Sequence, residues 1–294
     1  MKTAVALSAV LGMLSSVSAH YTFDKLVVNG VQQGGDNTYV RKHQNGYMPT
    51  KFKNIPSGSI SPTDADFTCN KQSTPAAQVY KVKAGDKVAL KQAFGGTGMK
   101  HPGPTQFYFS PVADAKSGTG SDWYKVSQSL LCTAGGPETL RSDAWCSYGE
   151  DNVNFVVPAT VPDGQYLVRG EHIALHGAHD GQAEFYYACA QLEVTGNSAA
   201  TSMPGTGVKI PGVYKQADAS VNFSVWGKST AYDLTPGPDV IPGGTIRGSA
   251  SGAGGDKTTT VGGGSSSSTG TSAQSAKPSS AVSAESAGNC KCQN

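Results

Sequence analysis

The chain has 294 residues, of which 37% are hydrophobic and only 15% are charged, with 37 glycines and 16 prolines. This length suffices for one large domain or two small ones, and the low charge with abundant glycine argues against a helical bundle or a coiled coil. The 23 basic and 21 acidic residues leave a net charge of +2 and form no basic stripe, so we expect no nucleic-acid partner.

The first nineteen residues are typical of a secretory signal peptide. Lys2 supplies the positive charge, residues 4–14 form a short apolar stretch, and residues 17–19 resemble a small-residue cleavage site. We therefore predict cleavage after residue 19 and a secreted, extracellular product that begins at His20; the alternative is a buried N-terminal helix. No later segment reaches the ~18 apolar residues that span a bilayer, so we expect no membrane partner.

Between residues 20 and 247 the sequence alternates short β-rich runs with turns. The turn at 83–86 separates two such runs in the manner of a hairpin. Long loops rich in glycine and proline separate the others, and no convincing amphipathic helix is present. These features predict an all-β domain, an immunoglobulin- or fibronectin-III-like β-sandwich with long loops. We expect strands at 23–29, 78–82, 87–91, 105–112, 152–157, 165–176, 183–194 and 221–226.

The sequence from 248 to 294 is low in complexity and rich in Gly, Ser and Thr. No aromatic residue follows residue 232, so this stretch cannot bury enough apolar surface to offset its ordering entropy. We predict a disordered, flexible tail without a carbohydrate-binding module. Its two cysteines, Cys290 and Cys292, are expected to have no structural role.

The other four cysteines lie within the predicted domain, and a secreted protein favours disulfides. A bridge between Cys69 and Cys189 would close a long loop, worth about 4–5 kcal/mol in the chain-entropy model. Cys132 and Cys146 would close a shorter loop. Because six cysteines allow many connectivities, both pairings are hypotheses at this point.

His20, as the predicted first residue, would offer a metal ion two nitrogens: its α-amine and its ring Nδ1. One further imidazole would complete three nitrogens in a T-shape, which suits Cu(II). His101 begins a stiff His-Pro-Gly-Pro turn, and a ligand on a rigid loop loses little entropy on binding; the alternative is a structural turn histidine. The remaining candidates are His43, His172, His176 and His179.

Two adjacent runs, 170–176 and 184–191, carry further polar residues. His172 and His176 have the i, i+4 spacing of a zinc helix, but the glutamate of the zinc-protease motif is absent. Alternating apolar residues favour strands instead, which places His172 and His176 on one face of the first run and Glu184 and Tyr186 on one face of the next. Core packing is the alternative for Tyr186.

Taken together, the sequences at 20–23, 101–109, 175–191 and 210–214 resemble the fungal lytic polysaccharide monooxygenases of auxiliary-activity family 9, formerly classed as glycoside hydrolase family 61. The resemblance spans about 20–226. It implies one copper ion per chain and oxidative cleavage of β-1,4-glucan, usually cellulose, at C1, C4 or both. It also implies O2 or H2O2 as oxidant and an external electron donor, either a small reductant or a redox protein such as cellobiose dehydrogenase. We expect a monomer.

The resemblance also implies residue roles. His20 and His101 match the pair of copper-binding histidines, and Tyr186 matches the axial tyrosine. His176 matches the histidine that hydrogen-bonds bound oxygen species. Glu184 stands where the family usually has glutamine, and we expect a Glu184→Gln variant to bind copper but to show a changed activity–pH profile.

Two more residues are candidates outside the metal site. Tyr214 matches a surface tyrosine that stacks on sugar rings in the family, although an ordinary loop tyrosine is the alternative. Asn222 begins an Asn-Phe-Ser sequon for N-glycosylation, but the strand expected at 221–226 would oppose modification there.

Two other functions compete with the monooxygenase. A glycoside hydrolase needs two opposed carboxylates, for which Glu171 and Glu184 are the candidates, and it would act without a reductant. A non-catalytic module that binds polysaccharide or copper would bind its ligand and release no oxidised sugars.

Overall fold

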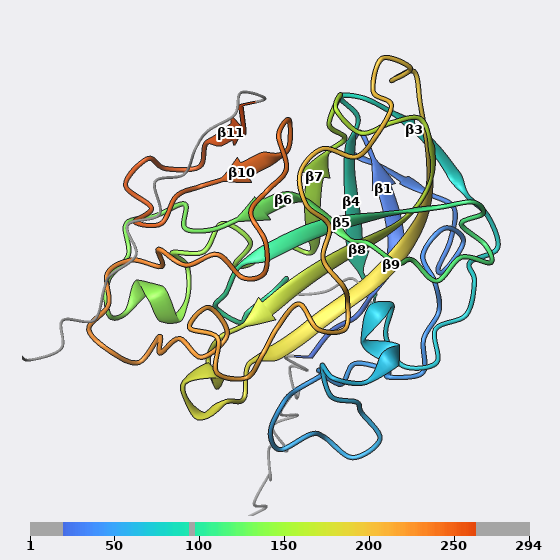
Figure 1. Ribbon diagram of the computed structural model, residues 1–294. Helices are drawn as coiled ribbons and strands as arrows, with labels where there is room; N and C mark the ends of the chain where they lie inside the picture. Colours follow the sequence, from blue (N-terminus) through green and yellow to red (C-terminus); the bar gives the residue numbers. More distant parts are fainter. Residues whose placement is uncertain (1–19, 94–97, 263–294) are drawn as a thin grey trace, which may run out of the picture. The chain divides into compact units, whose positions relative to one another are not determined.

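The computed structural model describes residues 20–93 and 98–262 (Figure 1). These residues form strands and three short 3-10 helices, η1 (Ala65–Thr68), η2 (Thr139–Arg141) and η3 (Ala178–Asp180). The predicted all-β sandwich is confirmed. The predicted signal peptide and the cysteines of the tail lie outside the described residues. No helix in the described ranges is long and apolar enough to cross a membrane.

Two sheets build the sandwich (Figure 1). The smaller has the order β2-β1-β4-β7, and the larger has the order β11-β10-β6-β5-β8-β9-β3. The strands of the smaller sheet are β1 (Phe23–Val28), β2 (Val31–Gln33), β4 (Lys87–Gln92) and β7 (Asn152–Val156). Those of the larger sheet are β3 (Tyr80–Lys83), β5 (Thr105–Val112), β6 (Tyr124–Ser129), β8 (Gly164–Ala174), β9 (Glu184–Thr195), β10 (Thr245–Arg247) and β11 (Thr258–Thr260).

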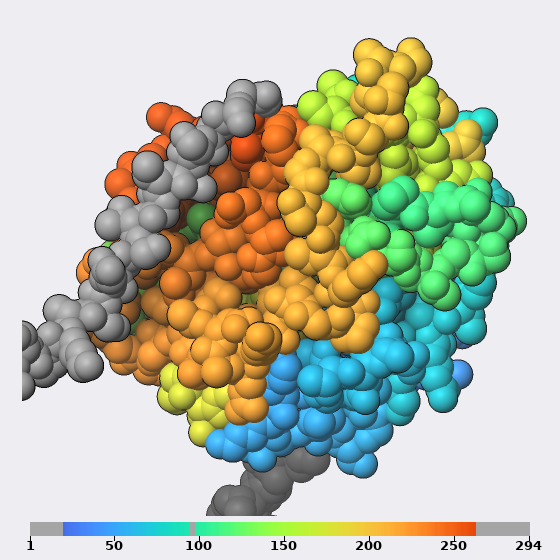
Figure 2. Space-filling model, in the orientation of Figure 1, coloured from blue at the N-terminus to red at the C-terminus, as the bar shows by residue number. Residues whose placement is uncertain are grey.

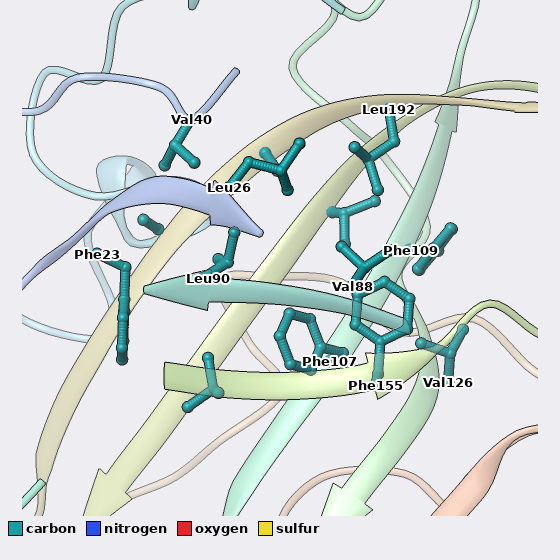
Figure 3. Packing of buried hydrophobic residues seen from close by; sticks show 14 of the residues in the cluster. Phe23, Leu26, Val40, Val88, Leu90, Phe107, Phe109, Val126, Phe155 and Leu192 are labelled. Atoms are coloured by element: carbon teal, nitrogen blue, oxygen red, sulfur yellow. The ribbon is translucent and has the colours of Figure 1, made fainter. Parts of the chain in front are cut away.

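The main core lies between the two sheets (Figure 3). Leu90 of β4, Phe107 of β5 and Phe155 of β7 are all at most 3% exposed, and the ring centroids of the two phenylalanines are 4.4 Å apart. A Cβ at Gly170 of β8 would lie 2.7 Å from side-chain atoms of both Leu90 and Phe107. The sheets therefore approach so closely that only glycine fits at this point of β8.

A second core covers the outer face of the larger sheet and fixes the long loops to it. The disulfide Cys69–Cys189 ties the loop after η1 to β9 across 120 residues of sequence, and Cys132–Cys146 closes a loop of 14. Both predicted pairings are confirmed. The strands that carry the candidate site are thus held on both faces.

The ordered domain extends beyond the predicted boundary at residue 247. β10 pairs in parallel with β6, and β11 pairs with β10. Backbone hydrogen bonds order this segment although it contains no aromatic residue. The strand expected at 221–226 is also wrong, because this stretch forms turns and bends. The hairpin expected around 83–86 is wrong as well, because β3 pairs with β9 in the larger sheet and β4 pairs with β1 and β7 in the smaller one.

Candidate functional site

The candidate site forms where β8 ends and β9 begins. In their antiparallel pairing His172 lies opposite Tyr186, and Ala174 lies opposite Glu184. Side chains alternate across a strand, so Glu184 and Tyr186 emerge on the same face of β9. This is the arrangement that the sequence predicts.

His101 is held beside these strands by its rigid turn. The backbone N–H groups of Ile173 and Leu175 donate to the carbonyls of Pro104 and Pro102, at 3.0 and 2.8 Å. A Cβ at Gly103, whose φ is +153°, would lie 1.8 Å from the carbonyl oxygen of Ile173. Glycine therefore permits the turn to lie directly on β8, which fixes the base of the His101 side chain.

The structure gathers the four predicted residues His20, His101, His176 and Tyr186. The ring centroids of His20 and His101 are 6.2 Å apart, and each lies 6.2 or 5.8 Å from that of Tyr186. His176 stacks on His101 at 4.4 Å. Nδ1 of His176 is buried and has no hydrogen-bond partner among the described residues. These histidines, Tyr186, Glu184 and His172 are called the histidine cluster below.

Glu184 connects the cluster to its surroundings. Its Oε2 accepts a hydrogen bond of 2.7 Å from the Tyr186 hydroxyl and lies 3.6 Å from Nε2 of His176. Burial by itself would raise the pKa of Glu184, but the contact with His176, the charge of that imidazole and the Tyr186 hydrogen bond together lower the pKa to about 2. Glu184 is therefore a carboxylate at ordinary pH.

Tyr21 packs against the cluster and contacts two of its members, Tyr186 and His172. The Tyr21 ring stacks on Tyr186 with a centroid distance of 4.2 Å, and its hydroxyl shares a hydrogen bond with Nδ1 of His172. Burial and, secondly, the nearby His101 lower the pKa of His172 to about 3. His172 is consequently a neutral imidazole that supports the aromatic stack.

The donor set fits a copper ion. Imidazole nitrogens and a phenol oxygen suit tetragonal Cu(II) better than a hard cation such as Mg²⁺. The 6.2 Å between the ring centroids of His20 and His101 leaves room for one ion between them, given metal–imidazole bonds of about 2 Å as in zinc sites. Elsewhere in the described residues, Cys132, Cys146 and Asp256 also lie close together. The two cysteines form a disulfide and offer no thiolate, so this group is a poor metal site.

A family model for Auxiliary Activity family 9 (formerly GH61) matches residues 20–232. The chain belongs to this family. An AA9 family lytic polysaccharide monooxygenase A of Aspergillus fumigatus is 45% identical over 254 residues, which cover 84% of this chain and 85% of the relative. Monooxygenase D of Emericella nidulans is 44% identical over 257 residues, covering 85% and 86% of the two chains. The protein is accordingly a lytic polysaccharide monooxygenase.

Solved structures agree with this family assignment. The crystal structure of HiLPMO9B has a TM-score of 0.61 and 26% identity, and the match covers 75% of this chain and 99% of that one. A cellulose-active polysaccharide monooxygenase from M. thermophila has a TM-score of 0.60 and 25% identity, covering 77% and 100%.

Tyr214 does not form the surface that its AA9 resemblance implies. Its side chain is only 3% exposed, and its hydroxyl donates to Glu171 at 2.6 Å and lies 2.8 Å from that of Tyr108. A ring in this position cannot stack on a sugar. Trp226 is the aromatic residue exposed beside the histidine cluster: it is 51% exposed, and its Nε1 donates to the carbonyl of His176 at 2.6 Å.

Glu171 is excluded as the partner carboxylate of a hydrolase. It is fully buried and forms an ion pair with Arg169, on the face of β8 opposite to His172. Since Glu184 lies on the histidine face, the two carboxylates do not converge on one bond. The geometry therefore does not provide the two opposed carboxylates that a glycoside hydrolase needs.

Asn222 lies in an exposed bend. The objection that it belongs to a strand therefore falls away, and N-glycosylation at this sequon stays a prediction. Its side chain lines a surface pocket of about 420 Å³ together with Lys53, His179 and Gln216. Figure 2 shows the blue segment near residues 50–70 meeting the gold-to-orange segment near 205–230 on the surface.

Two residues beside the cluster escape the sequence interpretation. Lys51 lies 3.6 Å from Glu184 and donates to Gln182 at 3.1 Å. Trp226 belongs to the stretch for which the sequence predicts a strand. Lys51 carries no motif, and only the pairing of its loop with β9 brings it to the site. The hydrophobic residues around Trp226 favour a strand and give no sign that its indole is exposed.

Proposed function

We propose that the protein is a secreted, copper-dependent monooxygenase that cleaves the β-1,4-glucosidic bonds of cellulose at C1, C4 or both. The observation that carries this proposal is the convergence of His20, His101 and Tyr186 around one point, with His176 and Glu184 beside them. Cellulose as substrate is supported by the similarity to the cellulose-active enzyme from M. thermophila.

His20 and His101 would hold the copper after cleavage of the signal peptide frees the α-amine of His20. A copper ion bound there would supply redox chemistry: together with an external electron donor and O2 or H2O2, it would provide an oxidant strong enough to abstract hydrogen from a sugar carbon. Three nitrogen donors stabilise the ion without enclosing it. The Tyr186 ring lies near both histidines, and its hydroxyl is fixed by its hydrogen bond to Glu184.

His176 and Glu184 would donate and accept hydrogen bonds and protons beside the oxygen species that reacts. The buried Nδ1 of His176 and the Nε2 that faces Glu184 give this imidazole one donor and one acceptor position. Glu184 holds the ring through a carboxylate rather than through the amide usual in the family. The stiff pairing of β8 with β9 keeps both residues in place during turnover.

An exposed surface rather than a deep cleft would receive the polymer. Trp226 presents one face of its indole to solvent, while the Arg141 guanidinium lies 5.2 Å from the ring centroid. A flat, anchored aromatic suits a crystalline chain, which cannot thread into an enclosed pocket. We assign to Trp226 the stacking role that the resemblance implied for Tyr214.

Mass spectrometry of sugars released from swollen cellulose by the copper-loaded, processed protein tests the proposal. Aldonic acids or 4-keto sugars that require ascorbate would support it and would identify the oxidised carbon. Native sugars released equally without ascorbate would overturn it in favour of a hydrolase. Tight copper and cellulose binding with no products would indicate a binding module.

A further inference from the structure

Lys51 is positioned by a short backbone pairing that reaches the first residues of β9. Thr50 and Phe185 exchange both backbone hydrogen bonds, at 3.1 and 2.9 Å, in an antiparallel bridge. In this register the next residue along the loop, Lys51, lies directly opposite Glu184. Directly opposed residues of antiparallel segments are the pairs whose side chains interact.

The Lys51 side chain approaches one oxygen of the Glu184 carboxylate and leaves the other for the site. Its Nζ is 3.6 Å from Oε1 of Glu184 and donates to Oε1 of Gln182 at 3.1 Å. Oε2 of Glu184 accepts from Tyr186 and faces His176. The two carboxylate oxygens thus have separate partners.

This ion pair differs from an ordinary surface pair because both side chains are largely removed from water. Lys51 and Glu184 are 13% and 8% exposed. Neighbouring Lys53 forms a pair with Asp180 at 2.7 Å, but those side chains are 47% and 51% exposed. Exposed pairs contribute little, whereas removal of one member of a buried pair leaves an uncompensated charge.

We propose that Lys51 is a positioning residue: its ammonium neutralises and orients Glu184, so that the carboxylate takes the place of the glutamine usual in the family. A glutamine at 184 that kept its oxygen toward Tyr186 would turn its NH2 group toward the Lys51 ammonium, donor against donor. Lys51 therefore selects a carboxylate at 184, and a carboxylate without Lys51 would place an unpaired negative charge beside the copper ligands. Lysine and glutamate act as one unit, and this inference rests on the proposed function.

A double-mutant cycle tests the unit in the copper-free protein. Lys51→Met and Glu184→Gln should each lower the melting temperature. The Lys51→Met/Glu184→Gln double variant should lose less than the sum of the two, because it leaves no unpaired charge. Lys53→Met is the matched control and should change the melting temperature little.

The copper(II) EPR spectrum and turnover supply the second test. Lys51→Met should shift the spectrum and lower turnover roughly 10- to 100-fold, the range typical of residues that orient metal ligands. Lys51→Arg should restore both, the double variant should return the spectrum toward wild type, and Lys53→Met should leave spectrum and turnover unchanged.

Additive melting shifts together with an unchanged Lys51→Met spectrum would overturn the inference. So would a double variant whose spectrum departs further from wild type than that of either single variant. If the wild type itself released no oxidised sugars, the proposed function would fail, while the copper-free cycle would still decide whether Lys51 and Glu184 are coupled.

Discussion

Two buried polar clusters lie on opposite faces of the same strand pair, β8 and β9. On one face Arg169 and Glu171 form an ion pair with both side chains fully buried, and the Arg169 guanidinium lies 3.7 Å from the ring centroid of Tyr187. On the other face lies the histidine cluster. The strand pair is the same in both cases, so the difference arises from the side chains on each face and from the segments packed against it, which bring in His20 and His101.

The two clusters differ in how their carboxylates are paired and in their exposure to solvent. Both oxygens of Glu171 are engaged, one by Arg169 and the other by Gln106 and Tyr214. In the histidine cluster Nδ1 of His176 has no hydrogen-bond partner within the described ranges. A buried polar group without a partner is costly, but such atoms occur in both clusters, because Nε of Arg169 and Oε1 of Gln106 also lack a partner in the described residues. What distinguishes the two clusters is access to solvent: the side chains of Arg169 and Glu171 are fully buried, whereas that of His176 is 33% exposed. We therefore expect the paired cluster of Arg169 and Glu171 to be structural and the accessible histidine cluster to take part in the reaction.

The largest effect is expected at the histidine cluster, in copper binding. His20→Ala removes an imidazole and the chelate ring, and should weaken copper binding roughly 100- to 1000-fold; structural metal sites gain about 10–16 kcal/mol from about four ligands, or about 2.5–4 kcal/mol each. Reductant-dependent product should disappear, while the melting temperature of the copper-free protein stays near wild type. Isothermal titration calorimetry measures the affinity.

His179→Ala is the matched control for that prediction. His179 is an exposed histidine of η3, close in sequence to His176. Its loss should leave copper affinity unchanged. Equal losses in the two variants would mean that copper binds histidines at random on the surface.

The second prediction concerns the paired cluster and should show the opposite pattern. Glu171→Gln leaves Arg169 as an uncompensated buried charge and should lower the free energy of unfolding by about 3–5 kcal/mol, measured by urea denaturation. Copper affinity should not change. Glu193→Gln, which disrupts an exposed pair with Lys81, should cost about 1 kcal/mol or less. A Glu171→Gln variant that is stable but copper-deficient would contradict the division between the two faces.

A third histidine, outside both clusters, separates the effect of burial from that of ligand binding. Nδ1 of His43 accepts from the Asn45 N–H, Nε2 lies 2.8 Å from the Thr22 hydroxyl, and burial lowers the pKa of His43 to about 4. The unfolded chain, with a histidine pKa near 6.5, takes up this proton first as the pH falls. Stability is therefore complete above pH ~6.5 and decreases by about 2–3 kcal/mol as the pH falls to ~4.

Denaturation curves from pH 7 to pH 4 test this expectation. His43→Gln should be less stable than wild type at pH 7 but should lose less of its stability on acidification. Parallel pH profiles for the two proteins would show that the His43 imidazole does not titrate abnormally.

Much of the fold could be predicted from the sequence because the long strands carry strong local signals. The run expected at 183–194 became β9 and that at 165–176 became β8, with small shifts at the ends. β2, β6, β10 and β11 were missed: three of them have only three residues each, and β6 carries only two hydrophobic side chains among polar ones. The order of β10 and β11 comes from pairing with β6, which is a non-local interaction.

The chemistry of an N-terminal histidine was enough to single out His20 as a candidate metal ligand, whereas Tyr186 was singled out only through the resemblance to the family. The candidate site was not predictable where burial decides the role. Tyr214 is buried because Glu171, Tyr108 and Gln106 bind its hydroxyl, and these partners lie more than 40 residues away. The pairing of Lys51 with Glu184 likewise depends on a bridge between distant segments.

The smallest effect is expected at the surface, and it contrasts Trp226 with Tyr214. Trp226→Ala removes the exposed indole and should weaken binding to insoluble cellulose about fivefold, or about 1 kcal/mol, the scale of a single aromatic contact. Tyr214→Phe should leave cellulose binding unchanged and lower the unfolding free energy by about 1–2 kcal/mol, because Glu171 loses a hydrogen bond. Copper affinity measured alongside should be wild type in both variants. Binding isotherms on cellulose decide between the two aromatics: a loss confined to Tyr214→Phe would mean that the buried ring turns outward to meet the polymer, and that Trp226 serves only to hold the carbonyl of His176.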